Sequence, residues 1–151
     1  MRQDVRNNNW SDSVCIVPPV QNQVDNAIND SDKSFVVPDN EMWKITYIMA
    51  DYNGAGGAGN RQFTIEVKNE SGAVVFVTNA GSPLGAGASI VFIAAPGYSH
   101  DTSVTNGESH ISWPPDLHLK PGWTLRTYDS NAVATGADDM YIDFQYLRYV
   151  I

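Results

Sequence analysis

The chain has 151 residues and a net charge of −8, with nine Lys and Arg against seventeen Asp and Glu. Proteins that bind nucleic acid or anionic membranes present a basic stripe or patch, whereas the basic residues here are scattered singly along the sequence. Direct binding of DNA, RNA or a membrane surface is therefore not expected. Apolar residues make up 42% of the chain, which is enough for one hydrophobic core, and the length predicts a single domain.

The sequence lacks the usual marks of an oxidising or membrane compartment. Cys15 is the only cysteine, so no intrachain disulfide is expected. The N-terminal segment lacks the apolar core of a signal peptide, and no apolar run approaches the ~20 residues of a membrane-spanning helix. We expect synthesis and assembly in a cytoplasm. Charged residues make up only 17% of the chain, so neutral polar side chains must cover much of the surface, as in many proteins that pack against neighbours.

Residues 1–20 differ in composition from the rest, and we predict an extended N-terminal arm there and a single domain over residues 21–151. Met1–Ser13 is polar and rich in Asn, and this composition would be disordered by itself. Val14–Pro19 is a short apolar segment that follows it. We expect the arm to lie on a neighbouring subunit; the alternative is that it folds back as an edge strand of its own sheet. The arm side chains expected to make the contact are Trp10, Val14, Ile16 and Val17.

Alternation of apolar and polar residues predicts strands through the first half of the domain. The first clear strand is Met42–Ala50, preceded by a turn at residues 36–40. Its side chains assigned to one face are Trp43, Ile45, Tyr47 and Met49. Arg61–Lys68 and Ala73–Thr78 form a predicted antiparallel hairpin, in which Phe63, Ile65 and Val67 point inward.

The second half continues the same pattern. Ser89–Ala95 is a continuous apolar run, which predicts a strand covered on both faces. A turn at Lys120-Pro121-Gly122 leads into a strand at Trp123–Asp129. Met140–Val150 is unusually long for a strand and is expected to cross the centre of a sheet. Weaker strands are predicted at Val24–Ile28, Ser34–Val37, His110–Trp113 and Asp116–Leu119.

These elements together predict the fold class. Eight or more short strands, frequent turn signals and no helical periodicity are typical of an all-β, antiparallel β-sandwich, and we expect it to be jelly-roll-like. The pairing order of the strands does not follow from one sequence.

One glycine-rich segment matches the letters of the dinucleotide-binding fingerprint GxGxxG, at Gly54-Ala55-Gly56-Gly57-Ala58-Gly59. That motif needs a helix after it, because the pyrophosphate binds at the N-terminus of the helix. The residues that follow, Arg61–Lys68, alternate as a strand. We therefore interpret the segment as a hairpin connection and predict no cofactor.

The sequence also supports neither a metal site nor a catalytic centre. His100, His110 and His118 have no second ligand at metal-binding spacing. Asp129, Asp138, Asp139 and Asp143 form the densest group of carboxylates, but their spacing is not that of a calcium loop. Cys15 has no basic partner nearby in sequence, and no serine lies in a GxSxG elbow. We expect a non-enzymatic protein.

The aromatic residues leave two kinds of binding open. Trp43 and Trp123 alternate with core residues, so we expect both to be buried, whereas Trp10 and Trp113 are freer. Exposed aromatic rings stack on sugars, and they are also favoured anchors of protein interfaces. Protein contact is the preferred interpretation, with Trp113 and Tyr98 as the loop residues that contact a partner; binding of a carbohydrate is the alternative.

A resemblance rests on turn and strand motifs between about Val36 and the C-terminus. The motifs are Val37-Pro38-Asp39-Asn40-Glu41-Met42-Trp43-Lys44-Ile45, Asn60-Arg61-Gln62-Phe63-Thr64-Ile65, Ala95-Pro96-Gly97, Leu119-Lys120-Pro121-Gly122-Trp123-Thr124-Leu125-Arg126-Thr127-Tyr128-Asp129-Ser130 and Asp138-Asp139-Met140. In these motifs the chain resembles small β-sandwich virion proteins of tailed bacteriophages, a group that includes capsid cement (decoration) proteins and neck or tail accessory proteins. The resemblance implies a non-enzymatic virion part, often a homotrimer on the shell.

The function expected from the sequence is that of a capsid cement protein, which binds the major capsid protein or other virion proteins through its arm and loops. The location would be the virion, after assembly in the host cytoplasm. Two alternatives remain at this point: a neck, tail or fibre-attachment accessory protein, and a carbohydrate-binding module for host attachment.

Overall fold

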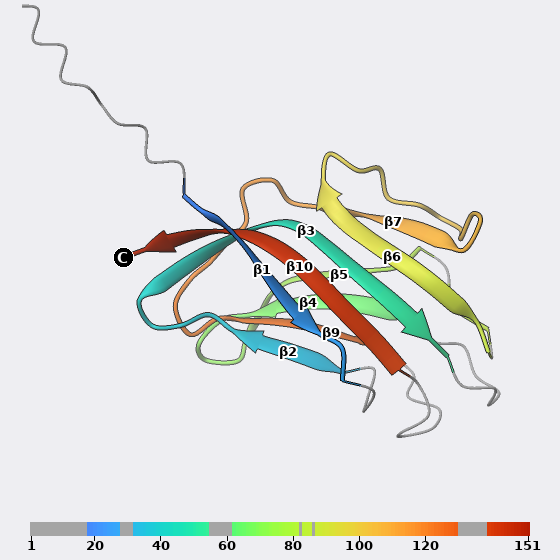
Figure 1. Cartoon of the computed structure of the whole chain (residues 1–151), viewed down its shortest axis with the longest axis horizontal. Helices are drawn as coiled ribbons and strands as arrows, with labels where there is room; N and C mark the ends of the chain where they lie inside the picture. Colours follow the sequence, from blue (N-terminus) through green and yellow to red (C-terminus); the bar gives the residue numbers. More distant parts are fainter. Residues whose placement is uncertain (1–17, 28–31, 55–61, 82, 86, 130–138) are drawn as a thin grey trace, which may run out of the picture.

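The computed structural model describes residues 18–27, 32–54, 62–81, 83–85, 87–129 and 139–151. In these ranges the chain forms ten strands and no helix, and the strands make two sheets that pack face to face (Figure 1). The predicted all-β sandwich is therefore confirmed. No described segment is a helix of the length and apolarity that a membrane span requires.

Sheet A is the larger of the two sheets. In spatial order it contains β1 (Val20–Asp25), β10 (Asp139–Val150), β3 (Glu41–Asn53), β6 (Ser89–Pro96) and β7 (Glu108–Trp113), with β8 (His118–Leu119) paired to the start of β3. Neighbouring strands are antiparallel, apart from β6 and β7, which run parallel. The long strand β10 lies between β1 and β3, so its predicted place inside a sheet is confirmed.

Sheet B is smaller and entirely antiparallel. Its spatial order is β2 (Lys33–Val36), β9 (Thr124–Asp129), β4 (Phe63–Lys68) and β5 (Val74–Asn79). The predicted hairpin is confirmed as β4 and β5, joined by the turn at residues 69–73. Because most strands that follow one another along the chain belong to different sheets, the core joins residues far apart in sequence.

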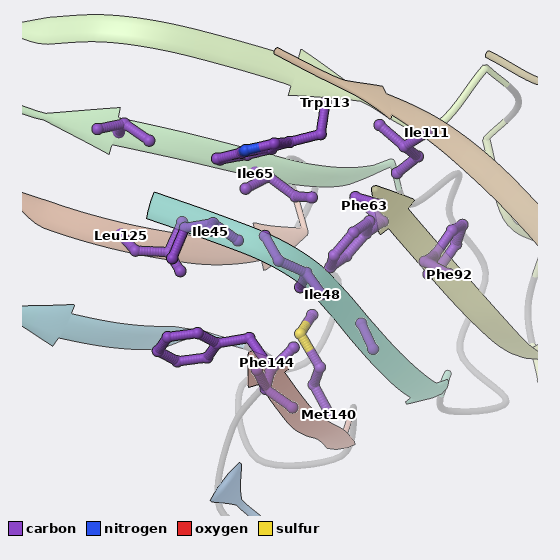
Figure 2. Packing of buried hydrophobic residues seen from close by; sticks show 14 of the residues in the cluster. Ile45, Ile48, Phe63, Ile65, Phe92, Ile111, Trp113, Leu125, Met140 and Phe144 are labelled. Carbon is purple, nitrogen blue, oxygen red and sulfur yellow. The ribbon is translucent and has the colours of Figure 1, made fainter. Parts of the chain in front are cut away.

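The core between the sheets is held by aromatic pairs that bridge them. Phe63 of sheet B stacks on Phe92 of sheet A, with ring centroids 4.5 Å apart, as Figure 2 shows. Two further bridging pairs meet edge to face: Phe35 with Phe144 at 4.8 Å, and Phe76 with Trp113 at 5.2 Å. Each such pair contributes about 0.5–1.5 kcal/mol beyond the area it buries, so the three together fix how the sheets align.

A β-bulge in β3 corrects one sequence prediction. Trp43 and Ile45 are buried as expected, but Tyr47 and Met49 both lie on the opposite, outer face of the strand. Ile45 pairs with Tyr146 and Tyr47 pairs with Gln145, so Thr46 is an extra residue without a partner of its own in β10. One extra residue reverses the alternation that follows. The buried residues of the second half of β3 are consequently Ile48, Ala50 and Tyr52.

A second correction concerns β6. Its predicted cover on both faces is wrong, because Ile90, Phe92 and Ala94 are buried whereas the alternating side chains between them are partly exposed. Because β6 is covered on one face only, the apolar side chains of its other face lie on the surface of sheet A.

The parallel pairing of β6 and β7 needs a return connection, residues 97–107, which in Figure 1 runs alongside β7. Its last turn contains Asn106 and Gly107, both with positive φ (53° and 81°), in the Asn-Gly pattern of a tight turn. The amide of Asp101 donates to the carbonyl of His110 at 2.9 Å. The outer edge of β7 is thereby partly covered by the chain itself.

Candidate protein-binding face

The residues that the sequence analysis proposed for partner contact do not come together in the described structure. Trp10, Val14, Ile16 and Val17 lie outside the described residues. The expectation that Trp113 is free in a loop is wrong: it ends β7, is 1% exposed and packs against Phe76. A side chain buried in this way contacts the core and no partner.

Tyr98 is exposed and follows β6, as the prediction requires. Its ring meets His110 edge to face, with centroids 5.0 Å apart. His110 is in turn bound by the carboxylate of Asp101, which accepts from the His110 amide at 2.7 Å and lies 2.9 Å from Nδ1. The hydrogen bond from the His110 amide lowers the pKa of Asp101 below its ordinary value. These contacts fix the loop that carries Tyr98 against β7.

The acidic residues considered as a calcium loop are dispersed. Asp129 is buried and accepts a hydrogen bond from the Tyr52 hydroxyl at 2.8 Å, whereas Asp143 lies on the outer surface of sheet A, and Asp138 is outside the described residues. Within the described ranges no three His, Cys, Asp or Glu side chains gather in a group that would hold a metal ion. The strand expected after the glycine-rich segment is confirmed as β4.

The feature that stands out is the outer face of sheet A. We define this outer face by eight side chains, all partly or largely exposed: Tyr47, Met49, Asp51, Val91, Ile93, Glu108, Tyr141 and Asp143. The strand registers place seven of them in two rows, and Val24 and His110 extend the first row at its ends. The first row runs Val24, Asp143, Met49, Ile93, His110, and the second runs Tyr141, Asp51, Val91, Glu108. Apolar side chains thus occupy β6 in both rows and β3 in the first row.

The bulge at Thr46 creates this face, because it turns Tyr47 and Met49 outward to join the outer residues of β6. If β3 alternated regularly through Thr46, these two side chains would point into the core. The two-sided apolar pattern of Ser89–Ala95 is the signal of this face in the sequence, and it is the same pattern that predicts a strand covered on both faces. A strand that is apolar on both faces either is covered by its own chain or presents an interface.

The electrostatics of the outer face of sheet A are one-sided. Asp51, Glu108 and Asp143 make no ion pair within the described residues, and one carboxylate oxygen of Asp143 is inaccessible and without a hydrogen-bond partner there. The pKa of Tyr47 reflects this excess of negative charge. Burial raises the pKa above its ordinary value, and the nearby Tyr98, Asp143 and Glu108 raise it further. A face of this kind is suited to a partner that brings donors or positive charge.

The outer face of sheet B has a different construction. Arg126 forms a bidentate pair with Asp32, through Nε–Oδ1 at 2.8 Å and Nη2–Oδ2 at 2.6 Å. Lys68 Nζ lies 2.9 Å from Oε1 of Glu66, and Arg126 Nη1 lies 3.6 Å from the same oxygen. The pairing with Asp32 raises the pKa of Arg126 above its ordinary value. The charges on this side therefore stabilise one another.

Comparison of the chain with protein-family models, with curated proteins and with solved structures found no match in any of the three. The assignment of function consequently depends on the motifs and the geometry described above. Among these features, the outer face of sheet A combines partly exposed apolar side chains with carboxylates that make no ion pair within the described residues.

Proposed function

We propose that the chain is a non-enzymatic structural protein of a tailed-bacteriophage particle, acting as a capsid cement (decoration) protein that binds the shell through the outer face of sheet A. The observation that carries the proposal is this face, where Met49 and Ile93 lie in one row with the unpaired carboxylate of Asp143. Apolar groups beside carboxylates that lack an ion pair are suited to a partner surface that covers the former and pairs with the latter.

The order of the strands supports a virion role through the fold type. With β7 and β8 set aside, the sheets have the orders β1-β10-β3-β6 and β2-β9-β4-β5. This is the order of an eight-stranded jelly roll, and we propose that the domain belongs to that type. Jelly rolls form many viral capsid proteins and also lectins. Fold type alone does not assign function, so this argument adds to the residues of the face and to the sequence resemblance.

A cement protein stabilises a capsid through contacts that the symmetry of the shell repeats. Many modest contacts, repeated over a symmetric shell, reinforce it without any single strong site. We propose a homotrimer as the unit that binds, as in the proteins that the chain resembles. Residues 1–20 would add a second contact by reaching a neighbouring capsomer, with the ordering cost that such an arm carries.

A matched pair of substitutions tests the binding face. Met49 lies opposite Asp143 in the outer row of sheet A, and Val77 lies opposite Glu66 in the outer row of sheet B. Each side chain is replaced by Lys, whose long stem still covers apolar neighbours and whose amine meets an acidic group. We expect Met49→Lys to abolish co-sedimentation with shells that lack this protein, and Val77→Lys to leave it unchanged, with both variants folded by circular dichroism.

Two results would contradict the proposal: equal binding by Met49→Lys and wild type, or absence of the chain from purified particles. Quantitative mass spectrometry of particles also separates cement from the neck, tail or fibre-attachment alternative. Cement proteins are present in hundreds of copies, whereas a neck or tail component is present in about a dozen.

A further inference from the structure

A pocket of about 430 Å³ lies at the end of sheet B, between two turns that are far apart in sequence. Its lining residues are Asn69, Glu70, Ser71, Lys120, Pro121 and Trp123. The volume falls in the range of small-molecule sites, about 300–1,000 Å³. Trp123, which we expected to be buried, is only partly so: it packs against the core and also forms a wall of this pocket.

The first turn, between β4 and β5, is fixed by one side chain. Oδ1 of Asn69 accepts hydrogen bonds from the amide of Ser71 at 3.1 Å, from the Ser71 hydroxyl at 2.8 Å and from the amide of Ala73 at 2.9 Å. The side-chain nitrogen Nδ2 of Asn69 and the Glu70 carboxylate have no hydrogen-bond partner within the described residues. Both are thus available to a ligand, on a loop that needs no rearrangement to present them.

The second turn, between β8 and β9, is equally well fixed. Pro121 and Gly122 occupy its central positions, Gly122 has φ of +72°, and the amide of Trp123 donates to the carbonyl of Lys120 at 3.0 Å. Val37 binds this turn through two backbone hydrogen bonds of 2.9 Å. Its amide donates to the carbonyl of Trp123, and its carbonyl accepts from the amide of Gly122. The backbone that carries the indole ring is therefore held by three hydrogen bonds, and the side chain packs against the core.

The two turns touch at Gly122, where an added Cβ would come within 3.4 Å of Cβ of Glu70. Glu70 and Trp123 therefore line the same pocket from the two turns. The amine of Lys120 lies 5.7 Å from the centroid of the Trp123 ring. A flat apolar surface, a carboxylate acceptor, an amide donor and an ammonium donor are thus gathered around one cavity.

We propose that this pocket is a subsite for one neutral hexopyranose unit. A pyranose ring has an apolar face of C–H groups, which stacks on an indole, and a rim of hydroxyls that both donate and accept hydrogen bonds. Glu70 accepts from two hydroxyls of the sugar, and the amide of Asn69 and the amine of Lys120 donate to others. The subsite does not rest on the proposed role in the virion, because it uses other residues at the end of the other sheet.

The test follows the indole N–H signals of the whole chain in ¹H–¹⁵N NMR spectra. Glucose, galactose, mannose and N-acetylglucosamine are titrated separately to millimolar concentrations. We expect one of these sugars to shift the signal of Trp123 in a saturable manner, whereas the signals of Trp43 and Trp113, both 1% exposed, stay in place.

Glu70→Gln should raise the Kd of that sugar about tenfold, because hydrogen bonds to a charged group are the stronger ones. Glu108→Gln, an unpaired acid on the outer face of sheet A, is the matched control and should leave the Kd unchanged. Trp123→Phe keeps most of the packing and should also weaken binding, followed at the amide of Ser71. The proposal is overturned if no sugar of the panel shifts the Trp123 signal, or if the two Glu variants bind equally well.

Discussion

On the outer face of sheet B, Asp32, Arg126, Glu66 and Lys68 pair with one another, whereas on the outer face of sheet A the carboxylates stand beside apolar side chains without an ion pair. In the first arrangement every charge lies beside an opposite charge. In the second, carboxylates without an ion pair lie beside partly exposed apolar side chains. The two faces of the sandwich therefore differ in how their charges are compensated.

The difference has a local origin in each sheet. In sheet B, β4 alternates regularly, so Thr64 and Glu66 point outward and are buried there beneath the neighbouring side chains. The guanidinium group of Arg126 lies over the ring of Tyr128, with Cζ 4.3 Å from the ring centroid. In sheet A the alternation of β3 is interrupted at Thr46, and large apolar side chains leave the core for the surface.

The largest effect is expected from insertion of one Ala between Gln145 and Tyr146 of β10, opposite Thr46. The inserted residue would give Thr46 a partner and remove the bulge. Without the bulge, Tyr47 and Met49 would take the inward positions of Ile48 and Ala50, and small and large side chains would exchange places in the core. We expect a loss of more than about 4 kcal/mol in the free energy of unfolding, at the upper end of effects of a single change. Urea denaturation followed by tryptophan fluorescence measures it. Unchanged stability would mean that the bulge does not determine which side chains face outward.

A smaller effect is expected from Arg126→Ala. This substitution removes the partner of Asp32 and one of the two cations beside Glu66, which is 7% exposed. Because Lys68 still neutralises Glu66, we expect a loss of about 1–2 kcal/mol in the free energy of unfolding. Glu108→Ala, on the outer face of sheet A, should change it by less than about 0.5 kcal/mol. Thermal unfolding of the two variants measures this difference in the free energy of unfolding. Equal losses in the two variants would contradict the proposed difference between the outer faces of the two sheets.

The smallest effect is expected from Asp143→Asn. An amide at this position costs less to desolvate than a carboxylate, so the isolated protein should be as stable as wild type or gain up to about 1 kcal/mol. Binding to shells should weaken, because the group that the partner pairs with has lost its charge. Loss of stability together with unchanged shell binding would assign Asp143 a purely structural role.

The same variant has a consequence for pH dependence. The folded protein holds the pKa of Tyr47 above 10, so the neutral phenol is favoured and its contribution to stability is complete below pH 10 and lost as the pH rises through the raised value. Asp143→Asn removes one of the causes, so the pKa of Tyr47 should fall while staying above its ordinary value, since burial is the largest cause. Ultraviolet absorbance titration of tyrosinate follows this change.

Much of the fold was predictable because most strands alternate without interruption. In β10 the inward positions Met140, Ile142, Phe144 and Tyr146 keep a period of two, and β4 and β5 flank a turn of recognisable composition. Trp113 was misjudged because the prolines after it suggested a loop. Its spacing from Ile111, with both side chains inward, was the better signal.

The two candidate sites were not predictable to the same degree. A bulge depends on the register between β3 and β10, which are separated by most of the chain, so no local pattern at Thr46 reveals it. The pocket at Trp123 depends on the meeting of two turns about fifty residues apart in sequence. The turn at Pro121-Gly122 was visible in the sequence, but its neighbour in space was not.

The position of β10 between β1 and β3 means that sheet A is completed late in synthesis, because β10 follows its neighbours in the chain. During synthesis the earlier strands leave the ribosome first, and until β10 emerges, sheet A has a gap that isolates β1 from the rest. Asp143 and Tyr141, which complete the outer face of sheet A, arrive only with that strand. The outer face of sheet A is therefore complete only after β10 has been synthesised and has paired with β3.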